Sequence, residues 1–181
     1  MLSKNYTLQE LGKIDIAPMV EEFKILTHKD WDFNTERQKT PDSAQKNTKF
    51  IPIIYYGKNY YLDKFQETIY VAKSAIQGVL GEIDIGRAIF TELPAGMVIG
   101  SHKDSGIFLE THTRIHIPLI SNNQVSFGVK EGNDWKSQYL EPGKFYALNN
   151  CKTFHAVHNK SNFNRYHLII DVKKLENRAI I

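Results

Sequence analysis

Cysteine, long apolar runs and clustered positive charge are all scarce in this sequence of 181 residues. The single cysteine, Cys151, excludes a disulfide within the chain, as is usual in reducing compartments. No apolar run approaches the roughly 20 residues of a membrane-spanning helix, and residues 1–6 lack the apolar core of a secretory signal peptide. We therefore expect a cytoplasmic protein that makes no membrane contact.

The charge distribution argues against a nucleic-acid partner. The 23 Lys and Arg residues exceed the 20 Asp and Glu residues by three, a formal net charge of +3, and they form no basic block. Hydrophobic residues make up 41% and charged residues 24% of the chain, which are ordinary proportions for a globular protein. With no internal repeat or low-complexity segment, the sequence predicts one domain over residues 1–181.

The first 82 residues mix helix and strand patterns and predict a supporting region. Apolar side chains recur at three- and four-residue steps in two segments, which is typical of amphipathic helices. A run of β-branched and aromatic residues that contains Pro52 predicts a strand near a sheet edge. The predicted elements are a short helix within 15–27, a mainly loop segment over 31–49, a strand over 50–55 and a helix over 61–80 closed by Gly81.

From residue 83 to 175 the pattern changes to short strands separated by turns. Pro, Gly, Asn and Asp gather between the apolar segments, as they do in tight turns. About eight short strands favour a jelly-roll sandwich or a small barrel, and hence a mainly β (α+β) fold whose outer face the helices would cover. The predicted strands are 87–93, 97–102, 114–120, 124–129, 135–140, 144–149, 155–159 and 165–172.

The segment His102-Lys103-Asp104 places an imidazole and a carboxylate two residues apart. Residues i and i+2 of a strand point to the same face, so the two side chains are neighbours. They could be two ligands of one metal ion or a hydrogen-bonded pair at the surface. A distant histidine would complete the two-histidine, one-carboxylate arrangement that holds non-haem Fe(II). His155 and His158 are both candidates, but they lie on opposite faces of a predicted strand, so only one can point inward.

Two further strands carry Arg and His side chains on a face that a sandwich would bury. Arg114 and His116 share one face of their strand, and Arg165 and His167 share one face of theirs. Buried charge is costly unless it is paired or binds a ligand, so the pattern indicates a polar cavity inside the fold. Arg165 could pair with a carboxylate of a cosubstrate, or it could form a structural ion pair with Asp171 or a glutamate.

Several stretches between residues 91 and 172 have the order and spacing of one enzyme family. They are Leu93-Pro94-Ala95-Gly96, His102-Lys103-Asp104, Arg114-Ile115-His116-Ile117-Pro118-Leu119, Asn149-Asn150, Phe154-His155-Ala156-Val157-His158-Asn159 and Arg165-Tyr166-His167-Leu168-Ile169-Ile170-Asp171. In these stretches the chain resembles the aspartyl/asparaginyl β-hydroxylase family of Fe(II)- and 2-oxoglutarate-dependent oxygenases. The resemblance implies a double-stranded β-helix core of the jelly-roll, cupin-like type over 83–175, with the N-terminal helices packed on one sheet. It also implies Fe(II), the cosubstrate 2-oxoglutarate and O2.

The resemblance also assigns roles to residues of this sequence. His102, Asp104 and His155 match the family's iron ligands and are the implied catalytic residues. An aspartate at position 104 is similar to the bacterial-type members and argues against a halogenase, because halogenases leave that position vacant for chloride. The residues that match the cosubstrate site are Arg165, which pairs with the distal carboxylate of 2-oxoglutarate, Arg114 and His116 of an Arg-x-His motif, and Thr91, which supports the same carboxylate.

The implied reaction is hydroxylation of a C–H bond of an amino acid, free or within a peptide or protein, with release of succinate and CO2. One alternative is a cupin-like metal-binding protein that uses no 2-oxoglutarate, such as an isomerase or a sensor. It would keep the three ligands but have no need of Arg165. Another alternative is a non-catalytic binding module, although such proteins commonly lose a ligand and this chain has all three.

Two polar segments are candidates for covering the site. Residues 105–113 follow two of the implied ligands directly and could touch substrate, although an ordinary sheet connection is the simpler alternative. Residues 35–49 could form a second flap, from which Arg37 would reach inward.

Overall fold

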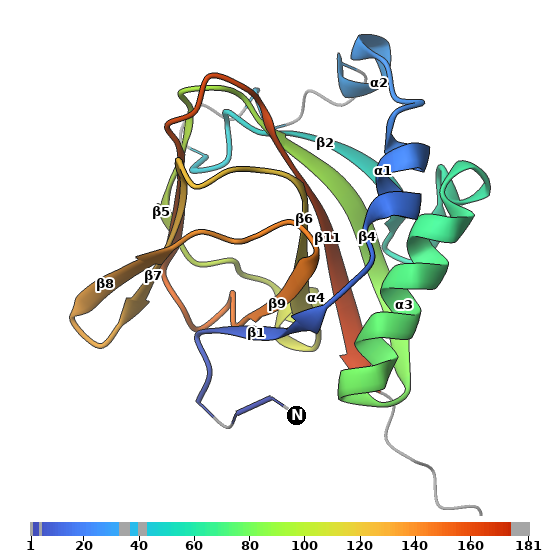
Figure 1. Cartoon of the computed structure of the whole chain (residues 1–181). Coiled ribbons are helices and arrows are strands. Elements are labelled where there is room, and N and C mark those ends of the chain that lie inside the picture. Colours follow the sequence, from blue (N-terminus) through green and yellow to red (C-terminus); the bar gives the residue numbers. More distant parts are fainter. Residues whose placement is uncertain (1, 4, 33–36, 40–42, 175–181) are drawn as a thin grey trace, which may run out of the picture.

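The structure is a computed structural model that describes residues 2–3, 5–32, 37–39 and 43–174. Within these residues two antiparallel sheets face each other, and helices pack on the outside of the larger sheet (Figure 1). The larger sheet has seven strands in the order β1-β9-β6-β11-β4-β2-β3, and the smaller has four in the order β5-β10-β7-β8. This arrangement confirms the predicted double-stranded β-helix with N-terminal helices on one sheet.

The eight predicted strands of the core all form, with small shifts of their ends. They correspond to β4 to β11, and β1 to β3 extend the larger sheet. The bounds are β1 Leu8–Lys13, β2 Lys49–Tyr55, β3 Lys58–Asn59, β4 Ile83–Leu93, β5 Val98–His102, β6 Thr113–Ile120, β7 Val125–Glu131, β8 Asp134–Gln138, β9 Lys144–Leu148, β10 His155–Asn159 and β11 Arg165–Lys174. The helices are α1 Ala17–Phe23, α2 His28–Asp32, the 3-10 turn η1 Leu62–Lys64, α3 Gln66–Leu80 and α4 Ile107–Glu110.

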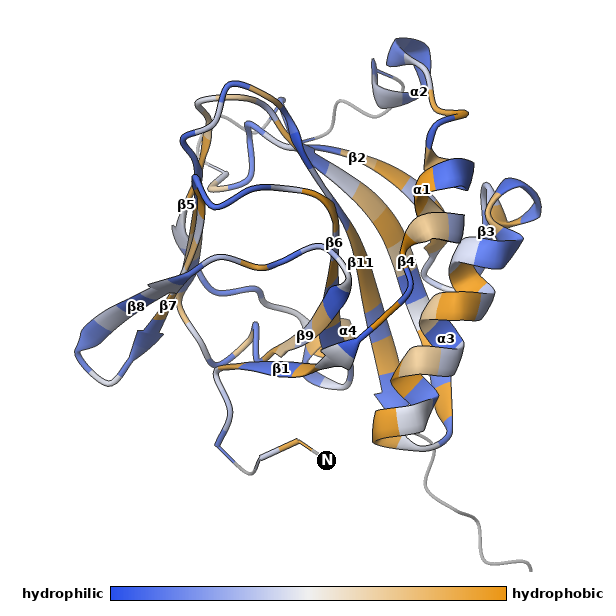
Figure 2. Cartoon of the chain, in the orientation of Figure 1, coloured by the Kyte–Doolittle hydropathy of each residue, from blue (hydrophilic) through white to orange (hydrophobic). Residues whose placement is uncertain are grey.

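The main apolar core lies between the larger sheet and the helices α1 and α3. Met19 and Phe23 of α1, Ile76 of α3 and Phe90 of β4 belong to one buried cluster. The Phe23 and Phe90 ring centroids are 5.3 Å apart. Figure 2 shows hydrophobic residues along β2 and β4 and on α3. Burying each of these side chains contributes roughly 1.5–3 kcal/mol, so the outer face carries much of the stabilisation and the inner face can hold polar groups.

The structure differs from the predicted elements at three places, which are two helices and one additional strand. The predicted helix over 15–27 ends at Phe23, and α2 follows it. The predicted helix over 61–80 is divided at Phe65, whose backbone (φ −127°, ψ 37°) is not helical. β1 was not predicted, because its apolar residues do not alternate and a bulge between Glu10 and Gly12 interrupts its pairing with β9. Pro52 was expected near a sheet edge. The structure agrees, because the edge strand β3 pairs only with Ile54 and Tyr55 of β2 and leaves Pro52 without a neighbour on that side among the described residues.

The alternation along β11 separates the apolar core from a polar interior. Leu168 and Ile170 belong to the cluster under the helices. Arg165, His167 and Asp171 are also buried, and they point to the opposite face, between the two sheets. The predicted polar cavity therefore lies inside the β-helix.

Candidate active site

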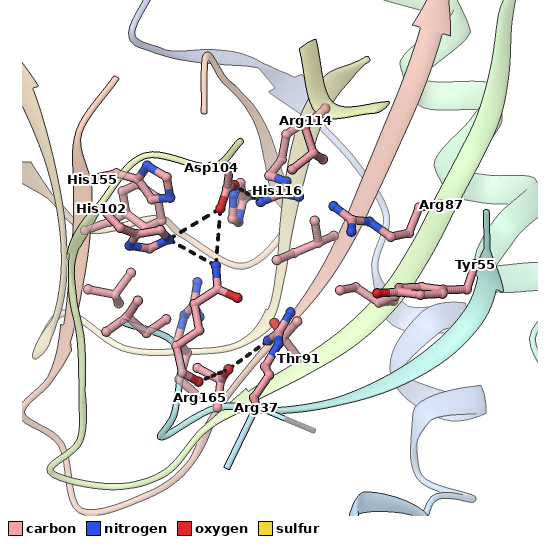
Figure 3. A pocket seen from close by; sticks show the side chains of 18 residues that line it. Arg37, Tyr55, Arg87, Thr91, His102, Asp104, Arg114, His116, His155 and Arg165 are labelled. Atoms are coloured by element: carbon pink, nitrogen blue, oxygen red, sulfur yellow. Dashed lines mark hydrogen bonds and ion pairs between the residues drawn. The ribbon is translucent and has the colours of Figure 1, made fainter. Parts of the chain in front are cut away.

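His102, Asp104 and His155 converge at one end of the space between the sheets (Figure 3). Their candidate ligand atoms all lie within 4.8 Å of one another. The antiparallel pairing of β5 and β10 brings this about, because it sets His155 directly opposite His102. Asp104 follows β5, where its backbone N–H donates to the carbonyl of Asn150 at 3.1 Å. His158 belongs to the other face of β10, so the inward histidine is His155.

Backbone carbonyls orient both imidazoles toward a shared point. Nδ1 of His102 lies 2.8 Å from the oxygen of Gly100, and Nδ1 of His155 lies 3.1 Å from the oxygen of Thr153. A carbonyl oxygen only accepts hydrogen bonds, so each Nδ1 carries the proton and each Nε2 presents a lone pair. Burial, together with the neighbouring His102, lowers the pKa of His155 to about 4. In the neutral tautomer with the proton on Nδ1, the Nε2 of each ring is the atom that binds a metal.

The carboxylate of Asp104 is oriented by its neighbours. Its Oδ2 accepts hydrogen bonds from Nη1 of Arg114 and, at 2.9 Å, from Nδ2 of Asn150. Its Oδ1 lies 3.5 Å from Nε2 of His102. Burial acts to raise the pKa of Asp104, but the adjacent imidazole of His102, the charge of Arg114 and the amide of Asn150 together hold this pKa well below its usual range. One oxygen is therefore anchored, and the other faces the two histidines.

A buried ion network lies behind Asp104. Asp171 is fully buried and accepts from Nε of Arg87 at 2.6 Å and from Nε of Arg114 at 2.9 Å. Arg114 bridges the two carboxylates of Asp171 and Asp104. Burial acts to lower the pKa of Arg114, yet the two carboxylates raise it above its usual value. Since Asp171 pairs with Arg87 and Arg114, the alternative that Asp171 neutralises Arg165 is wrong.

Arg165 is a buried cation for which the described residues provide no carboxylate. Its side chain is 2% exposed, and Nη2 donates to Nδ1 of His167 at 2.6 Å. Its Nε has no hydrogen-bond partner among the described residues. Burial lowers the pKa of Arg165 to about 9. The charge of a buried group without a carboxylate partner is costly, so the site favours an anionic ligand.

Neutral imidazoles surround Arg165. Both ring nitrogens of His116, and Nε2 of His167, lack hydrogen-bond partners in the part of the chain that the structure describes. The two ring centroids are 5.9 Å apart. Burial, and next to it the charges of nearby arginines, lower the pKa of both histidines well below the usual value. This end of the cavity thus combines one cation with free polar atoms, which suits the carboxylate of a bound cosubstrate.

All seven residues assigned from the family resemblance line one cavity of about 240 Å³. The hydroxyl of Thr91 donates to the carbonyl of His167 at 3.3 Å. Arg114 contacts two carboxylates, so its contact with a cosubstrate stays a prediction. The seven are Thr91, His102, Asp104, Arg114, His116, His155 and Arg165.

Gln45 is a site residue that the sequence did not indicate. Its Nε2 lies 3.0 Å from Nε2 of His102 and 3.3 Å from Oδ1 of Asp104. The segment 43–48 reaches this position by pairing with β5, where the N–H of Gly100 donates to the carbonyl of Ala44 at 3.1 Å. No local pattern marks Gln45, because its contacts are made across more than fifty residues. Asn150 lies in one of the stretches that resemble the family, but the sequence does not indicate its hydrogen bond to Asp104.

Arg37 does reach inward, as the flap hypothesis expected, and it lines the same cavity. Its Nη1 donates to Oγ1 of Thr48 at 2.7 Å, and its guanidinium lies over the Phe50 ring, 4.5 Å from the centroid. Residues 35–36 and 40–42 of the predicted flap lie outside the described residues. Residues 105–113 were the other segment expected to cover the site. They contain α4, and Leu109 of this helix lines the cavity.

The donor set fits a divalent iron. Two neutral imidazoles and one carboxylate face a common point on one side, an arrangement that leaves other coordination positions open. Arg165 adds a carboxylate-binding group in the same cavity. A jelly-roll fold with this set of groups defines the class of non-haem Fe(II) oxygenases that use a 2-oxoacid cosubstrate.

The family assignment agrees with this class. The sequence profile described as aspartyl/asparaginyl beta-hydroxylase matches residues 15–174. The chain belongs to this family of Fe(II)- and 2-oxoglutarate-dependent oxygenases, and it is an enzyme that uses Fe(II), 2-oxoglutarate and O2. No curated protein sequence matches the chain. No helix within the described ranges is long and apolar enough to cross a membrane.

Solved structures of other oxygenases share the fold. A 2-oxoglutarate–Fe(II) oxygenase from Burkholderia pseudomallei is 16% identical with a TM-score of 0.57, over 77% of this chain and 75% of that one. A prolyl-4-hydroxylase from Pseudomonas putida is 10% identical with a TM-score of 0.57, over 95% of both chains. A prolyl hydroxylase from Trichoplax adhaerens, in complex with a hypoxia inducible factor peptide fragment, is 13% identical with a TM-score of 0.51, over 70% of this chain and 63% of that one.

Proposed function

We propose that this enzyme hydroxylates a C–H bond of an amino acid, free or within a peptide or protein, while 2-oxoglutarate is converted to succinate and CO2. One observation carries the proposal. The His102, Asp104 and His155 cluster shares a cavity with Arg165, a buried cation that no described carboxylate neutralises. A 2-oxoacid with a second carboxylate needs both groups within one small cavity, because one of its ends would chelate the metal and the other would pair with Arg165.

The roles of the residues follow from their positions. His102, Asp104 and His155 would hold Fe(II), and Arg165 would bind the distal carboxylate of 2-oxoglutarate. Both ring nitrogens of His116 lack a partner among the described residues, and His116 lines the same cavity, so it is available to contact the cosubstrate. Thr91 would support the distal carboxylate from the neighbouring strand. When bound, Fe(II) and 2-oxoglutarate supply the activation of O2 that C–H oxidation requires.

The protein would contribute orientation and a dry environment. Arg114 and Asn150 hold Oδ2 of Asp104, which leaves Oδ1 to face the metal position. The charges in this network are buried, so they act at a lower effective dielectric than in water. Arg114 is therefore assigned mainly as a positioning residue for Asp104, in addition to its predicted contact with the cosubstrate.

The nature of the substrate remains a separate question. A cavity of about 240 Å³ accepts a cosubstrate and a side chain or a small free molecule rather than a folded segment. The peptide in the Trichoplax adhaerens complex belongs to that enzyme. For this chain it supports only the part of the proposal in which the substrate is a peptide or protein. The extent of the oxygenase domain over residues 1–181 stays a prediction.

The first test is anaerobic visible absorption. Fe(II) is added to metal-free protein, followed by 2-oxoglutarate, and a metal-to-ligand charge-transfer band is expected in the wild type. The band should be absent in His155→Ala and weakened in Arg165→Ala. His158→Ala is the matched control, because it removes a histidine from the opposite face of the same strand and should leave the band intact.

The same experiment separates the cupin-like alternative. If Fe(II) binds but 2-oxoglutarate produces no band in the wild type, the oxygenase proposal is wrong and a metal protein without an oxoacid takes its place. That alternative leaves the burial of Arg165 unexplained. A band in wild type followed by succinate release would leave only the substrate to be found.

A further inference from the structure

The cavity holds more positive than negative charge. Asp104 and Asp171 form one balanced network with Arg87 and Arg114, in which every charged group has an opposite partner. Arg37 is the cation that remains besides Arg165. Within the described residues it forms no ion pair with a carboxylate, although its side chain is turned into the cavity.

Arg37 and Arg165 lie over different parts of the larger sheet. Arg37 sits against β2, where it contacts Thr48 and the Phe50 ring. Arg165 begins β11, and β4 separates the two strands in the sheet. Neighbouring strands are about 4.8 Å apart, so the backbones of β2 and β11 lie roughly 10 Å apart. The like charges that act on Arg37 are those of Arg114 and Arg87, and not that of Arg165.

The surroundings of Arg37 are arranged to hold a free guanidinium. Thr48 fixes Nη1, and the Phe50 ring supports the guanidinium plane. The remaining N–H groups have no hydrogen-bond acceptor among the described residues. Burial, and then the like charges of Arg114 and Arg87, lower the pKa of Arg37 to about 10, so its environment opposes a positive charge that brings no partner of its own.

Binding of metal and cosubstrate does not remove this surplus. Fe(II) brings two positive charges and 2-oxoglutarate two negative charges, so together they leave the surplus of two positive charges unchanged. The distal carboxylate would pair with Arg165, and Arg37 would still have no anionic partner among the described residues and the bound groups. A substrate carboxylate would give Arg37 that partner, with an interaction strengthened where the pair is shielded from water.

We propose that Arg37 is a substrate-binding residue and that the substrate carries a free carboxylate, which pairs with the Arg37 guanidinium on the β2 side of the cavity. This inference rests on the proposed function, because it takes Arg165 as the cosubstrate's partner. The carboxylate can be the α-carboxylate of a free amino acid or the side chain of an acidic residue. A neutral residue inside a peptide chain is excluded.

The first experiment needs no substrate. Thermal unfolding of metal-free protein is compared for wild type, Arg37→Gln and Arg87→Gln. Arg37→Gln should have a Tm equal to or above that of wild type, because a partly buried charge with no carboxylate partner among the described residues is removed while an amide can still bond to Thr48. Arg87→Gln should lower Tm, because it leaves Asp171 with one partner fewer. A loss of Tm in Arg37→Gln as large as in Arg87→Gln would make Arg37 structural and overturn the proposal.

The second experiment uses matched pairs of probes. Each standard L-amino acid is offered as the free acid and as its α-amide, and Asp- and Glu-containing peptides with capped termini are offered beside their Asn and Gln counterparts. The readouts are the change of the anaerobic charge-transfer band on probe addition and succinate release in air. Only probes with a carboxylate should act, and Arg37→Gln should raise their KM about 10- to 100-fold. Arg37→Lys should recover part of that loss, since it keeps the charge.

The possible outcomes separate the two proposals. Activity on free acids but not on capped acidic peptides identifies the α-carboxylate, and the reverse identifies the acidic side chain. An amide probe that wild type and Arg37→Gln turn over equally well would overturn the Arg37 proposal and leave the oxygenase assignment standing. Absence of the band in wild type before any probe is added would instead overturn the proposed function. If no probe acts, the Tm comparison still decides the role of Arg37.

Discussion

His102 and His155 lie directly opposite each other on paired strands, with their ring centroids 4.2 Å apart. Each ring is oriented by a backbone carbonyl at Nδ1, so Nε2 is the atom that each ring offers to an ion, and Nε2 of Gln45 lies 3.0 Å from that of His102. The pair therefore depends on the register of β5 and β10. A shift of one residue would send His155 to the opposite face of its strand.

Metal binding should stabilise the protein through this pair. A metal that binds only the folded chain at a concentration 100 times its Kd adds about 2.7 kcal/mol to the free energy of unfolding. Anaerobic Fe(II) should therefore raise Tm in wild type, and His155→Ala should abolish the rise. The control is His158→Ala, on the other face of the strand. An equal rise in wild type and His155→Ala would place the metal elsewhere.

The network around Asp171 predicts a large stability effect for Arg114. Removing this guanidinium leaves the carboxylates of Asp104 and Asp171 buried with fewer partners, which costs about 3–5 kcal/mol. Arg114→Gln should lose this much free energy of unfolding in denaturant titrations. Lys24→Gln, which removes only an exposed partner of Glu21, should change little. A small effect of Arg114→Gln would mean that water already screens the network.

Arg165 should determine the affinity for 2-oxoglutarate. Loss of its charge-assisted hydrogen bonds should raise the Kd of the cosubstrate about 10- to 100-fold in Arg165→Met. Arg165→Lys should keep part of the affinity, because a lysine retains the charge but not the planar pair of donors. Anaerobic titration of the charge-transfer band with 2-oxoglutarate measures the Kd of both variants. Wild-type affinity in Arg165→Met would transfer the carboxylate-binding role to another residue.

The buried histidines predict a loss of stability in mild acid. His116 and His167 have pKa values well below the usual one in the folded state, so the unfolded chain takes up protons first as the pH falls. The free energy of unfolding should thus be highest above the unfolded-state pKa of about 6.5 and should fall below it by up to about 1.4 kcal/mol per pH unit for each histidine.

Denaturant titrations of metal-free protein between pH 7 and pH 5 measure this slope. His167→Gln should reduce it, whereas a substitution of the exposed His28 should leave it unchanged. A slope that does not respond to His167→Gln would mean that another group takes up the protons.

Much of the fold and the metal site could be predicted from local pattern. Strand alternation alone assigns Arg165 and His167 to one face of β11 and Leu168 and Ile170 to the other, and the structure agrees. The spacing of His102 and Asp104, with a distant histidine, was enough to suggest a metal site. The ends of the helices were less predictable. The break at Phe65 follows from its burial against the sheet, which no local propensity expresses.

The pairing of charges could not be predicted. Asp171 was a possible partner of Arg165 by proximity in the sequence, yet it bonds to Arg87 and Arg114. Gln45 and Arg37 reach the cavity from a polar segment that carries no periodic pattern. In each case the partner is chosen by distance in space, and that distance depends on how β2, β4, β6 and β11 lie side by side.

The sequence by itself determined the strand-rich architecture and the inward direction of the polar residues, because side-chain alternation along a strand is a local property. The resemblance to the family implied the three metal ligands. Only the tertiary structure decided which histidine faces Asp104, which carboxylate neutralises which arginine, and that Arg37 and Arg165 have no carboxylate partner among the described residues. The physical reason is that the free energy of a buried charge depends on its nearest partner and on its distance from water. Both quantities exist only after the two sheets have packed.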